Sequence, residues 1–344
     1  MEQDLSRYSR QTLFDGIGES GQRRLADARV VIVGCGALGT VMTSNLGRAG
    51  VGHLTILDRD FVEESNLQRQ VLFDEEDVKN SIPKAVAAER KLRRINSQIE
   101  VKGIVTDVNY TNVEDLIRGA TLVMDGTDNF ETRFLVNDAC VKHGIPWIYG
   151  ACVGSYGLSM VILPRETPCL RCLFGTAPPP GMTPTCDTAG VISPIVNIIA
   201  SFQCMEAIKL LTGNKDKVSR DLLSMDVWDD RFQRLKVTGR RELADCPCCV
   251  HGNFEYLTAE GGSQTTTLCG TNSVQVSFPK GHKVNLKEIG ARLGRVGKVT
   301  LNPFLLRCTV EQYELTVFKD GRAIIQGTSE PTVAKTVYAK YIGV

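Results

Sequence analysis

Apolar, β-branched segments alternate with amphipathic ones over the first 160 residues of the chain. Residues 28–34 (ARVVIVG) form a continuous apolar run, which is typical of a strand buried on both faces of a parallel sheet. Further strands are predicted at 53–58, 99–105, 121–125 and 146–149, and helices at 38–49, 83–95, 112–118 and 130–143. This alternation predicts an α/β fold with a Rossmann-like, doubly wound sheet that binds its ligand at the carboxyl ends of the strands.

The pattern changes to shorter segments after residue 150. A strand is predicted at 158–163, whereas residues 175–190 (GTAPPPGMTPTCDTAG) contain too much Pro and Gly for regular structure. We expect them to form a functional or disordered loop. An apolar helix is predicted next, at 194–211, and then strands at 222–227 and 232–237.

The last third of the chain has a pattern of its own. Residues 252–267 (GNFEYLTAEGGSQTTT) have the composition of a linker. Beyond them we predict a strand at 274–278, a helix at 286–293, three strands between 297 and 327, and a final helix at 331–341. The predicted organisation is therefore a first domain over 1–251, a linker over 252–267 and a small α+β domain over 268–344.

Composition narrows the class of protein. Of the 344 residues, 42% are hydrophobic and 23% charged, so the chain can bury a full core. The net charge of +1 argues against a nucleic-acid or anionic-membrane partner. No apolar run reaches about 18 residues, and the first residues, MEQDLSRYSRQ, are polar. We therefore expect neither a membrane span nor a signal peptide, and we expect the protein to be cytoplasmic.

Residues 34–39 (GCGALG) fit the pattern G-x-G-x-x-G between a predicted strand and a predicted helix. Glycine at Gly34, Gly36 and Gly39 allows a tight turn and a close approach to phosphate, which the helix N-terminus attracts. Asp58 ends the next strand, where a carboxylate would bind a ribose hydroxyl. The motif by itself fits a dinucleotide, ATP, or a glycine turn without any nucleotide.

Charged residues that follow this motif favour a triphosphate. Arg69 and Lys84 offer fixed positive charge, and Asp128 follows the carboxyl end of a strand, where a ligand of Mg²⁺ would lie. Any one of them alone is more often a solvated surface charge. Together they favour ATP, because an enzyme that transfers hydride needs only one pyrophosphate contact.

Two Cys-x-x-Cys pairs are separated by 73 residues. Cys169 and Cys172, with Cys246 and Cys249, can give tetrahedral sulfur coordination of Zn²⁺. Four thiolates leave no open position, so such a zinc would be structural. Cys248 is an extra thiol inside the second pair, and the spacing favours Cys249. The alternative is four reduced surface cysteines.

Two further cysteines are candidate reactive thiols. Cys186 lies in the Pro- and Gly-rich loop just before a predicted helix, where a thiol can have a lowered pKa and act as a nucleophile. The alternative for Cys186 is an inert loop cysteine. Cys269, at the start of the last domain, is either a sulfur relay or an inert thiol.

Several motifs occur together in an order that is similar to one protein family. They are RYSRQ (7–11), GCGALG, SNLQRQ (65–70), Pro83-Lys84, DGTDN (125–129), CDTAG (186–190) and the two Cys-x-x-Cys pairs. In this order they resemble the ThiF/MoeB/HesA family, the bacterial relatives of ubiquitin-activating enzymes. The resemblance covers 7–249, and residues 128–158 look most like the thiamine-pathway branch. Residues 302–323 resemble an extension found on some members.

The resemblance implies a role for each matching residue. The three glycines would line the ATP phosphates, Asp58 would hold the ribose, and Asp128 would organise Mg²⁺. Asn66, Arg69 and Lys84 would bind the triphosphate. Arg10 resembles an arginine that reaches into the site of a partner subunit, which implies a homodimer. Cys186 matches a cysteine that the family associates with sulfur transfer.

The implied activity is ATP-dependent adenylation of the C-terminal Gly-Gly carboxylate of a ubiquitin-like sulfur carrier protein, on a ubiquitin-activating-type adenylation fold. Pyrophosphate is released, and the carrier is prepared to form a thiocarboxylate for the thiamine thiazole. A sulfur donor, such as a cysteine desulfurase or a rhodanese-type protein, would be a further partner. The molybdopterin-synthase carrier is the alternative substrate. An NAD-dependent oxidoreductase and a catalytically silent scaffold are the alternatives from other classes.

Overall fold

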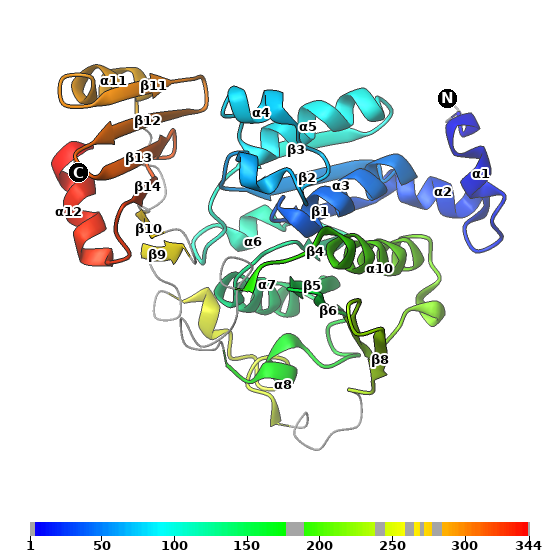
Figure 1. The fold of residues 1–344 in the computed structure, drawn as a ribbon. Coiled ribbons are helices and arrows are strands. Elements are labelled where there is room, and N and C mark those ends of the chain that lie inside the picture. The colour runs from blue at the N-terminus through cyan, green and yellow to red at the C-terminus, as the bar shows by residue number, and fades with distance from the viewer. Residues whose placement is uncertain are drawn as a thin grey trace. The chain divides into compact units, whose positions relative to one another are not determined.

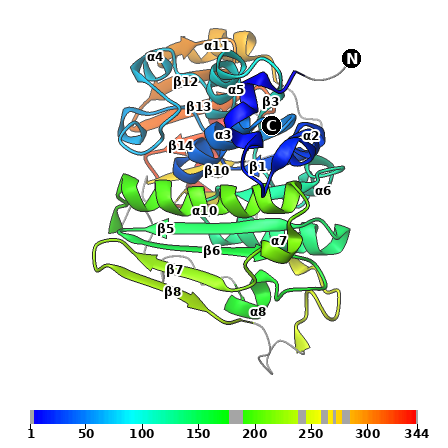
Figure 2. The same cartoon turned by 90° about the vertical axis from the view of Figure 1, so that its right-hand side faces the viewer.

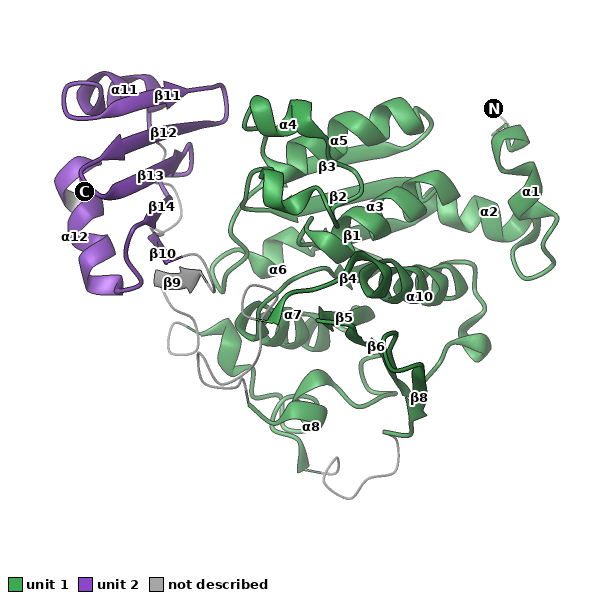
Figure 3. Cartoon of the chain, viewed as in Figure 1, with its two compact units in different colours: residues 1–258 green, residues 259–344 purple. Residues whose placement is uncertain are grey.

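The computed structural model describes residues 4–176, 189–237, 245–258, 265–268, 272–276 and 284–342. The chain divides into two compact units, residues 1–258 and residues 259–344 (Figure 3). The first unit carries an eight-stranded sheet, and the second carries a six-stranded sheet.

The sheet of the first unit has the strand order β3-β2-β1-β4-β5-β6-β7-β8. Its strands are β1 (Arg29–Val33), β2 (His53–Asp58), β3 (Glu100–Val105), β4 (Leu122–Asp125), β5 (Trp147–Val153), β6 (Tyr156–Ile162), β7 (Leu222–Asp226) and β8 (Arg231–Leu235). Pairing is parallel from β3 to β5 and antiparallel from β5 to β8. The predicted α/β class and doubly wound parallel core are thus confirmed, with an antiparallel extension on one side.

Helices cover both faces of this sheet (Figure 1). They are α1 (Ser9–Thr12), α2 (Gly18–Asp27), α3 (Ala37–Ala49), α4 (Glu75–Lys79), α5 (Lys84–Ile95), α6 (Val113–Leu116), α7 (Phe130–His143), α8 (Leu170–Phe174) and α10 (Ser193–Leu211). Val31 and Val33 of β1 share a buried cluster with residues of α6 and α7. Because side chains alternate along a strand, Val30 and Ile32 face the opposite layer, where α3 contacts β1.

The helix α10 is, by length and composition alone, apolar enough to cross a membrane, and half of it is buried within the fold. It packs on α3, β5 and β6, and Figure 2 shows it running alongside β5 and β6. Ile195, Val196 and Ile199 are fully buried in this packing. The packing accounts for the apolar composition of the helix.

The loops after the parallel strands meet at one edge of the sheet. The N–H of Gly34 donates to Leu57 O (2.8 Å), and the N–H of Gly126 donates to Val33 O (2.8 Å). The opposite edge is closed by the N-terminal segment: Gln11 Nε2 donates to Ala49 O (2.9 Å) at the end of α3. The two edges are separated by the length of α3, which is about 20 Å for 13 residues.

The second unit is an α+β domain, as predicted. Its sheet has the order β11-β12-β13-β14-β10-β9, and α11 and α12 pack on it. The elements are β9 (Thr265–Leu268), β10 (Ser273–Val276), α11 (Leu286–Leu293), β11 (Lys298–Leu301), β12 (Leu305–Val310), β13 (Tyr313–Phe318), β14 (Ala323–Gln326) and α12 (Pro331–Tyr341). All neighbouring strands pair antiparallel.

The prediction of three strands between 297 and 327 was wrong, because there are four. Asn302 makes the difference: its Oδ1 accepts from the N–H groups of Phe304 (2.8 Å) and Leu305 (2.9 Å) and folds a tight turn between β11 and β12. Within residues 252–267, the 3₁₀ turn η5 (Glu255–Leu257) belongs to the first unit, and β9 pairs with β10.

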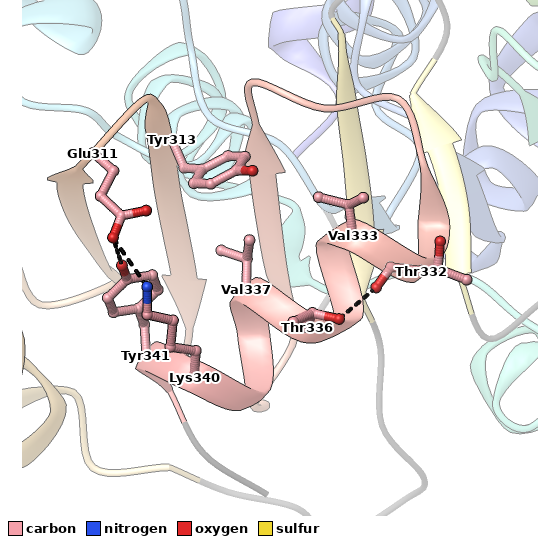
Figure 4. Close-up of a pocket in the computed structure, with 8 residues that line it drawn as sticks. All are labelled: Glu311, Tyr313, Thr332, Val333, Thr336, Val337, Lys340 and Tyr341. Atoms are coloured by element: carbon pink, nitrogen blue, oxygen red, sulfur yellow. Dashed lines mark hydrogen bonds and ion pairs between the residues drawn. The ribbon is translucent and has the colours of Figure 1, made fainter.

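A shallow groove runs along α12 in the second unit (Figure 4). Val333, Val337 and Tyr313 give it an apolar lining. At one end Glu311 Oε1 accepts hydrogen bonds from Lys340 Nζ (3.0 Å) and Tyr341 OH (2.7 Å). Of the predicted site residues that the structure describes, none lines this groove.

Close packing of the glycine loop gives a prediction about stability. A Cβ on Gly39 would lie 2.0 Å from Gly34 O, whereas a Cβ on Gly36 would meet nothing closer than Gln70 Nε2 at 3.9 Å. We therefore expect Gly39→Ala to lower the free energy of unfolding by about 1–3 kcal/mol. Gly36→Ala, the matched control, should cost less. Urea unfolding followed by circular dichroism measures both, and equal losses would contradict the close approach.

Candidate functional site

The loop between β1 and α3 contains the three motif glycines. Gly34 has φ of +88°, a conformation that glycine adopts without strain. The carboxylate of Asp58 holds this loop: its Oδ2 accepts from the N–H of Cys35 (2.6 Å), and its Oδ1 accepts from the N–H of Asp60 (2.7 Å). The loop therefore leads directly into the N-terminus of α3, an arrangement that attracts phosphate.

A cluster of charges lies beside this loop. Lys84, the first residue of α5, places its Nζ 3.3 Å from Asp60 Oδ2. Arg59 donates from Nη1 to Asp107 Oδ1 (2.9 Å), and its Nε lies 3.8 Å from Asp60 Oδ1. Sequence analysis missed Arg59, Asp60 and Asp107 as site residues, although their positions at the carboxyl ends of β2 and β3 would have indicated them.

The buried charges of this cluster shift one another's pKa values. Burial by itself lowers the pKa of Lys84, but the negative charges of Asp60, Asp58 and Asp128 outweigh it, and the pKa rises above its usual value. Burial raises the pKa of Asp58, and the Lys84 ammonium opposes that change. The geometry agrees with these effects: Asp60, which pairs with Lys84, donates its N–H to Asp58 Oδ1, and a Cβ on Gly34 would lie 2.6 Å from Gly126 O in the loop that carries Asp128. Lys84 thus keeps its positive charge throughout the physiological range.

The loop after β4 carries Asp128, and hydrogen bonds with Asp125 and Arg133 hold it in place. Asp125 Oδ1 accepts from the N–H (2.9 Å) and hydroxyl (2.7 Å) of Thr127, and its Oδ2 lies 3.3 Å from Arg133 Nε. Arg133 Nη2 in turn donates to Thr127 O (2.7 Å) and to Gly150 O (3.3 Å). Asp125 and Arg133 are both buried. Sequence analysis gave neither of them a role, and a run of DGTDN followed by an arginine was the available signal.

Asn66 and Arg69 lie in the segment between β2 and α5. Asn66 is buried in the 3₁₀ turn η2 (Glu64–Asn66), and Arg69 Nη1 donates to Ser65 O (2.9 Å). The backbone of Val62 pairs with that of Ile82 (3.0 Å), which brings this segment to the start of α5 and to Lys84.

Arg10 does not lie in this cluster of the same chain. It is exposed on α1, at the amino edge of the sheet, where Figure 1 shows α1 and α2 at the far right. The structure therefore brings Gly34, Asp58, Lys84 and Asp128 together and keeps Arg10 of the same chain apart from them.

The four predicted cysteine ligands converge. Cys169 Sγ lies 3.8 Å from Cys172 Sγ and 3.7 Å from Cys246 Sγ, and Cys172 Sγ lies 3.4 Å from Cys249 Sγ. All four sulfur atoms lie within 4.8 Å of one another. Zn–S bonds of about 2.3 Å in a tetrahedron require sulfur atoms about 3.8 Å apart, so the cluster fits a zinc ion.

Cys248 is not one of these four residues, although its thiol interacts with that of Cys169. Its Sγ donates to Asp138 Oδ1 (3.2 Å) and accepts from Asn137 Nδ2 (3.3 Å), and both of these residues belong to α7. Asn137 Oδ1 also accepts from the N–H of Leu170 (2.9 Å), next to Cys169. One asparagine thus fastens both cysteine pairs to the same helix.

Cys186 and Cys269 lie outside the described residues.

Comparison with known proteins bears on the same regions. Residues 8–248 match the ThiF family. The chain is 48% identical over 338 residues to the sulfur carrier protein ThiS adenylyltransferase of Bacillus subtilis, covering 98% of this chain and 99% of that protein. It is 36% identical over 255 residues to the protein of the same name from Escherichia coli, covering 74% of this chain and 98% of that protein.

Solved structures agree with these relatives. The crystal structure of E. coli MccB with ATP matches with a TM-score of 0.63 and 26% identity, over 73% of this chain and 75% of that chain. The likeness supports an adenylation-type fold in the first unit. Because the family match spans well over half of the chain and the Bacillus relative spans nearly all of it, the chain belongs to the ThiF family.

Proposed function

We propose that this protein is an ATP-dependent adenylyltransferase that activates the C-terminal Gly-Gly carboxylate of a ubiquitin-like sulfur carrier. The observation that carries the proposal is the meeting of the Gly34 loop, Asp58, Lys84 and the Asp128 loop at one edge of the parallel sheet. The Bacillus and E. coli relatives, both named as sulfur carrier protein ThiS adenylyltransferases, support the same activity. Membership of the ThiF family favours it over the oxidoreductase alternative.

Residues of this chain are assigned to each part of the nucleotide. Gly34, Gly36 and Gly39, with the N-terminus of α3, receive the phosphates, and Asp58 holds the ribose. Asn66, Arg69 and Lys84 bind the triphosphate. The carrier carboxylate attacks the α-phosphorus, a new P–O bond forms, the bond to the bridging oxygen breaks, and pyrophosphate leaves.

This step needs no general base, because the attacking carboxylate is already ionised. The protein's task is to position both reactants and to balance charge on the phosphates. Lys84 suits this task, since its raised pKa keeps it protonated. Arg10 completes the site from a second copy of the chain, which accounts for its distance from the chain's own Lys84.

Asp128 is assigned as the carboxylate that holds Mg²⁺. Around Arg59 and Lys84 stand four carboxylates, those of Asp58, Asp60, Asp107 and Asp128. This excess of negative charge would oppose a triphosphate, so a divalent cation fits the donor set. When bound, Mg²⁺ would neutralise charge on the phosphates.

The thiamine-branch carrier is the proposed substrate. The relative named for ThiS is 48% identical over nearly the whole chain, whereas the relatives named MOCS3 are 36–39% identical over 54–58% of their own length. Cys186 is assigned to sulfur transfer after adenylation, with the sulfur supplied by a separate donor protein. We expect this work to take place in the cytoplasm, where thiols stay reduced.

The cysteine cluster is assigned as a structural zinc site of Cys169, Cys172, Cys246 and Cys249. The sulfur separations support this assignment, and four protein ligands leave no position for a substrate. A zinc there would fix α8 and the segment around Cys246 against α7.

The first prediction concerns Asp128. ATP–pyrophosphate exchange should require the carrier and Mg²⁺, and Asp128→Ala should slow it by a factor of about 10²–10³, the usual cost of one preorganised electrostatic group. The control is Asp216→Ala, which removes an exposed carboxylate that lies 3.5 Å from Lys217 Nζ. Near-normal exchange by the Asp128 variant would refute its assignment. Absence of exchange in the parent protein with any Gly-Gly carrier would refute the activity.

The second prediction concerns zinc. Elemental analysis should find one zinc per chain, and Cys249→Ala should lose it. The neighbouring variant Cys248→Ala should keep it, since that sulfur is bound to Asp138 and Asn137 instead. Chelation should lower the melting temperature, because metal binding is coupled to folding. Zinc retained by the first variant and lost by the second would reverse the ligand assignment.

The third prediction concerns residues 259–344. A chain that ends at residue 258 should fold and keep pyrophosphate exchange within a few-fold of the full chain. The match to the E. coli relative supports this, because it covers 98% of that protein but only 74% of this chain. A folded, truncated protein without exchange would assign the second unit to the catalytic machinery.

A further inference from the structure

An ion pair bridges the carboxyl ends of β2 and β3, beside the proposed nucleotide site. Arg59 follows Asp58 directly, and Asp107 lies two residues beyond the end of β3. Their Nη1 and Oδ1 atoms are 2.9 Å apart, and the two side chains are 19% and 14% exposed. The roles proposed above give neither residue a contact with phosphate, ribose or metal, and Asp107 contributes to them only its negative charge.

Backbone hydrogen bonds give the order of the loops along this edge. Gly126 N–H donates to Val33 O, Gly34 N–H to Leu57 O, and Thr106 N–H to Asp58 O (3.1 Å). The order is therefore β4, β1, β2, β3, with neighbouring strands about 4.8 Å apart. With the phosphates at the β1 loop and the ribose at Asp58 on β2, a nucleotide that continues in the same direction places its base at the end of β3.

We propose that Arg59 and Asp107 form the base subsite of the nucleotide site and select adenine. The proposal rests on the use of ATP proposed above. The planar guanidinium of Arg59 lies against the face of the purine, an arrangement that arginine favours and lysine cannot reproduce. The hydrogen bond from Arg59 Nη1 to Asp107 Oδ1 holds the guanidinium in this orientation.

The second oxygen of Asp107 accounts for the choice of base. No hydrogen bond to Asp107 Oδ2 is found among the residues that the structure describes. A carboxylate oxygen only accepts hydrogen bonds, so it suits the 6-amino group of adenine and repels the 6-oxo group of hypoxanthine or guanine. The pair thus supplies both a stacking surface and an acceptor.

Two other possible roles of the Arg59–Asp107 pair predict different results. If Arg59 served only as positive charge for the phosphates, lysine could replace it. Loss of that charge would then lower the affinity for inorganic tripolyphosphate as much as the affinity for ATP. If the pair served only to join β2 to β3, its loss would lower stability and leave the affinity of the folded protein unchanged.

The test is isothermal titration calorimetry of the full chain with Mg²⁺ and three probes: ATP, ITP and inorganic tripolyphosphate. Arg59→Lys should weaken ATP binding about tenfold and leave tripolyphosphate binding unchanged. Asp107→Asn should reduce the preference for ATP over ITP about tenfold, since an amide can donate to a 6-oxo group. Arg118→Lys is the matched control, because Arg118 and Asp115 form an exposed pair of the same kind at 2.7 Å.

The outcomes separate this inference from the proposed function. If the parent protein does not bind ATP, the proposed function fails. If the parent binds ATP and Arg59→Lys binds it equally well, or Asp107→Asn keeps the full preference over ITP, the base subsite is refuted. Equal losses for ATP and tripolyphosphate in Arg59→Lys would likewise overturn it, in favour of a phosphate role.

Discussion

The buried ion pair between Asp125 and Arg133 is the constraint on which the candidate site depends. It joins the end of β4 to α7 and, through Gly150, to β5. Both charges are removed from water, so loss of one partner would leave the other uncompensated, at a cost of about 3–5 kcal/mol. The rings of Phe130 and Tyr149 lie 5.6 and 5.5 Å from the guanidinium and limit its movement. The start of the Asp128 loop is therefore held in place through Thr127.

The helix α7 extends this constraint to the cysteine cluster. Arg133 serves the Asp128 loop, and one turn further along the helix Asn137 binds the backbone of Leu170 and the sulfur of Cys248. Asp138 adds a bond to the N–H of Tyr256 (3.1 Å). The loop before α7, the segment around Leu170 and the segment from Cys248 to Tyr256 thus meet on one helix.

Most of the fold could be predicted from local patterns, because the positions of apolar residues indicate which segments are buried and the capping residues indicate where helices begin and end. The bounds of β2, α7, α11 and α12 agree with the prediction to the residue. The strand predicted at 146–149 is longer as β5, because its hairpin with β6 continues the pairing from Trp147 to Val153. The charged pairs Arg59–Asp107 and Asp125–Arg133 could not be predicted in the same way. Each joins residues whose proximity depends on the order of strands in the sheet, and no pattern within a single segment contains that order.

The position of Arg10 follows from the same geometry. The loops that bind phosphate must lie at the carboxyl ends of the parallel strands, and the chain enters the sheet at their amino ends. The N-terminal segment is tied there by Tyr8, whose hydroxyl accepts from Asn96 Nδ2 (2.8 Å), and by Gln11. A helix as long as α3 therefore separates Arg10 from the glycine loop of its own chain. If Arg10 acts on the nucleotide, it does so in a second copy, and a homodimer is then a requirement of the catalytic site.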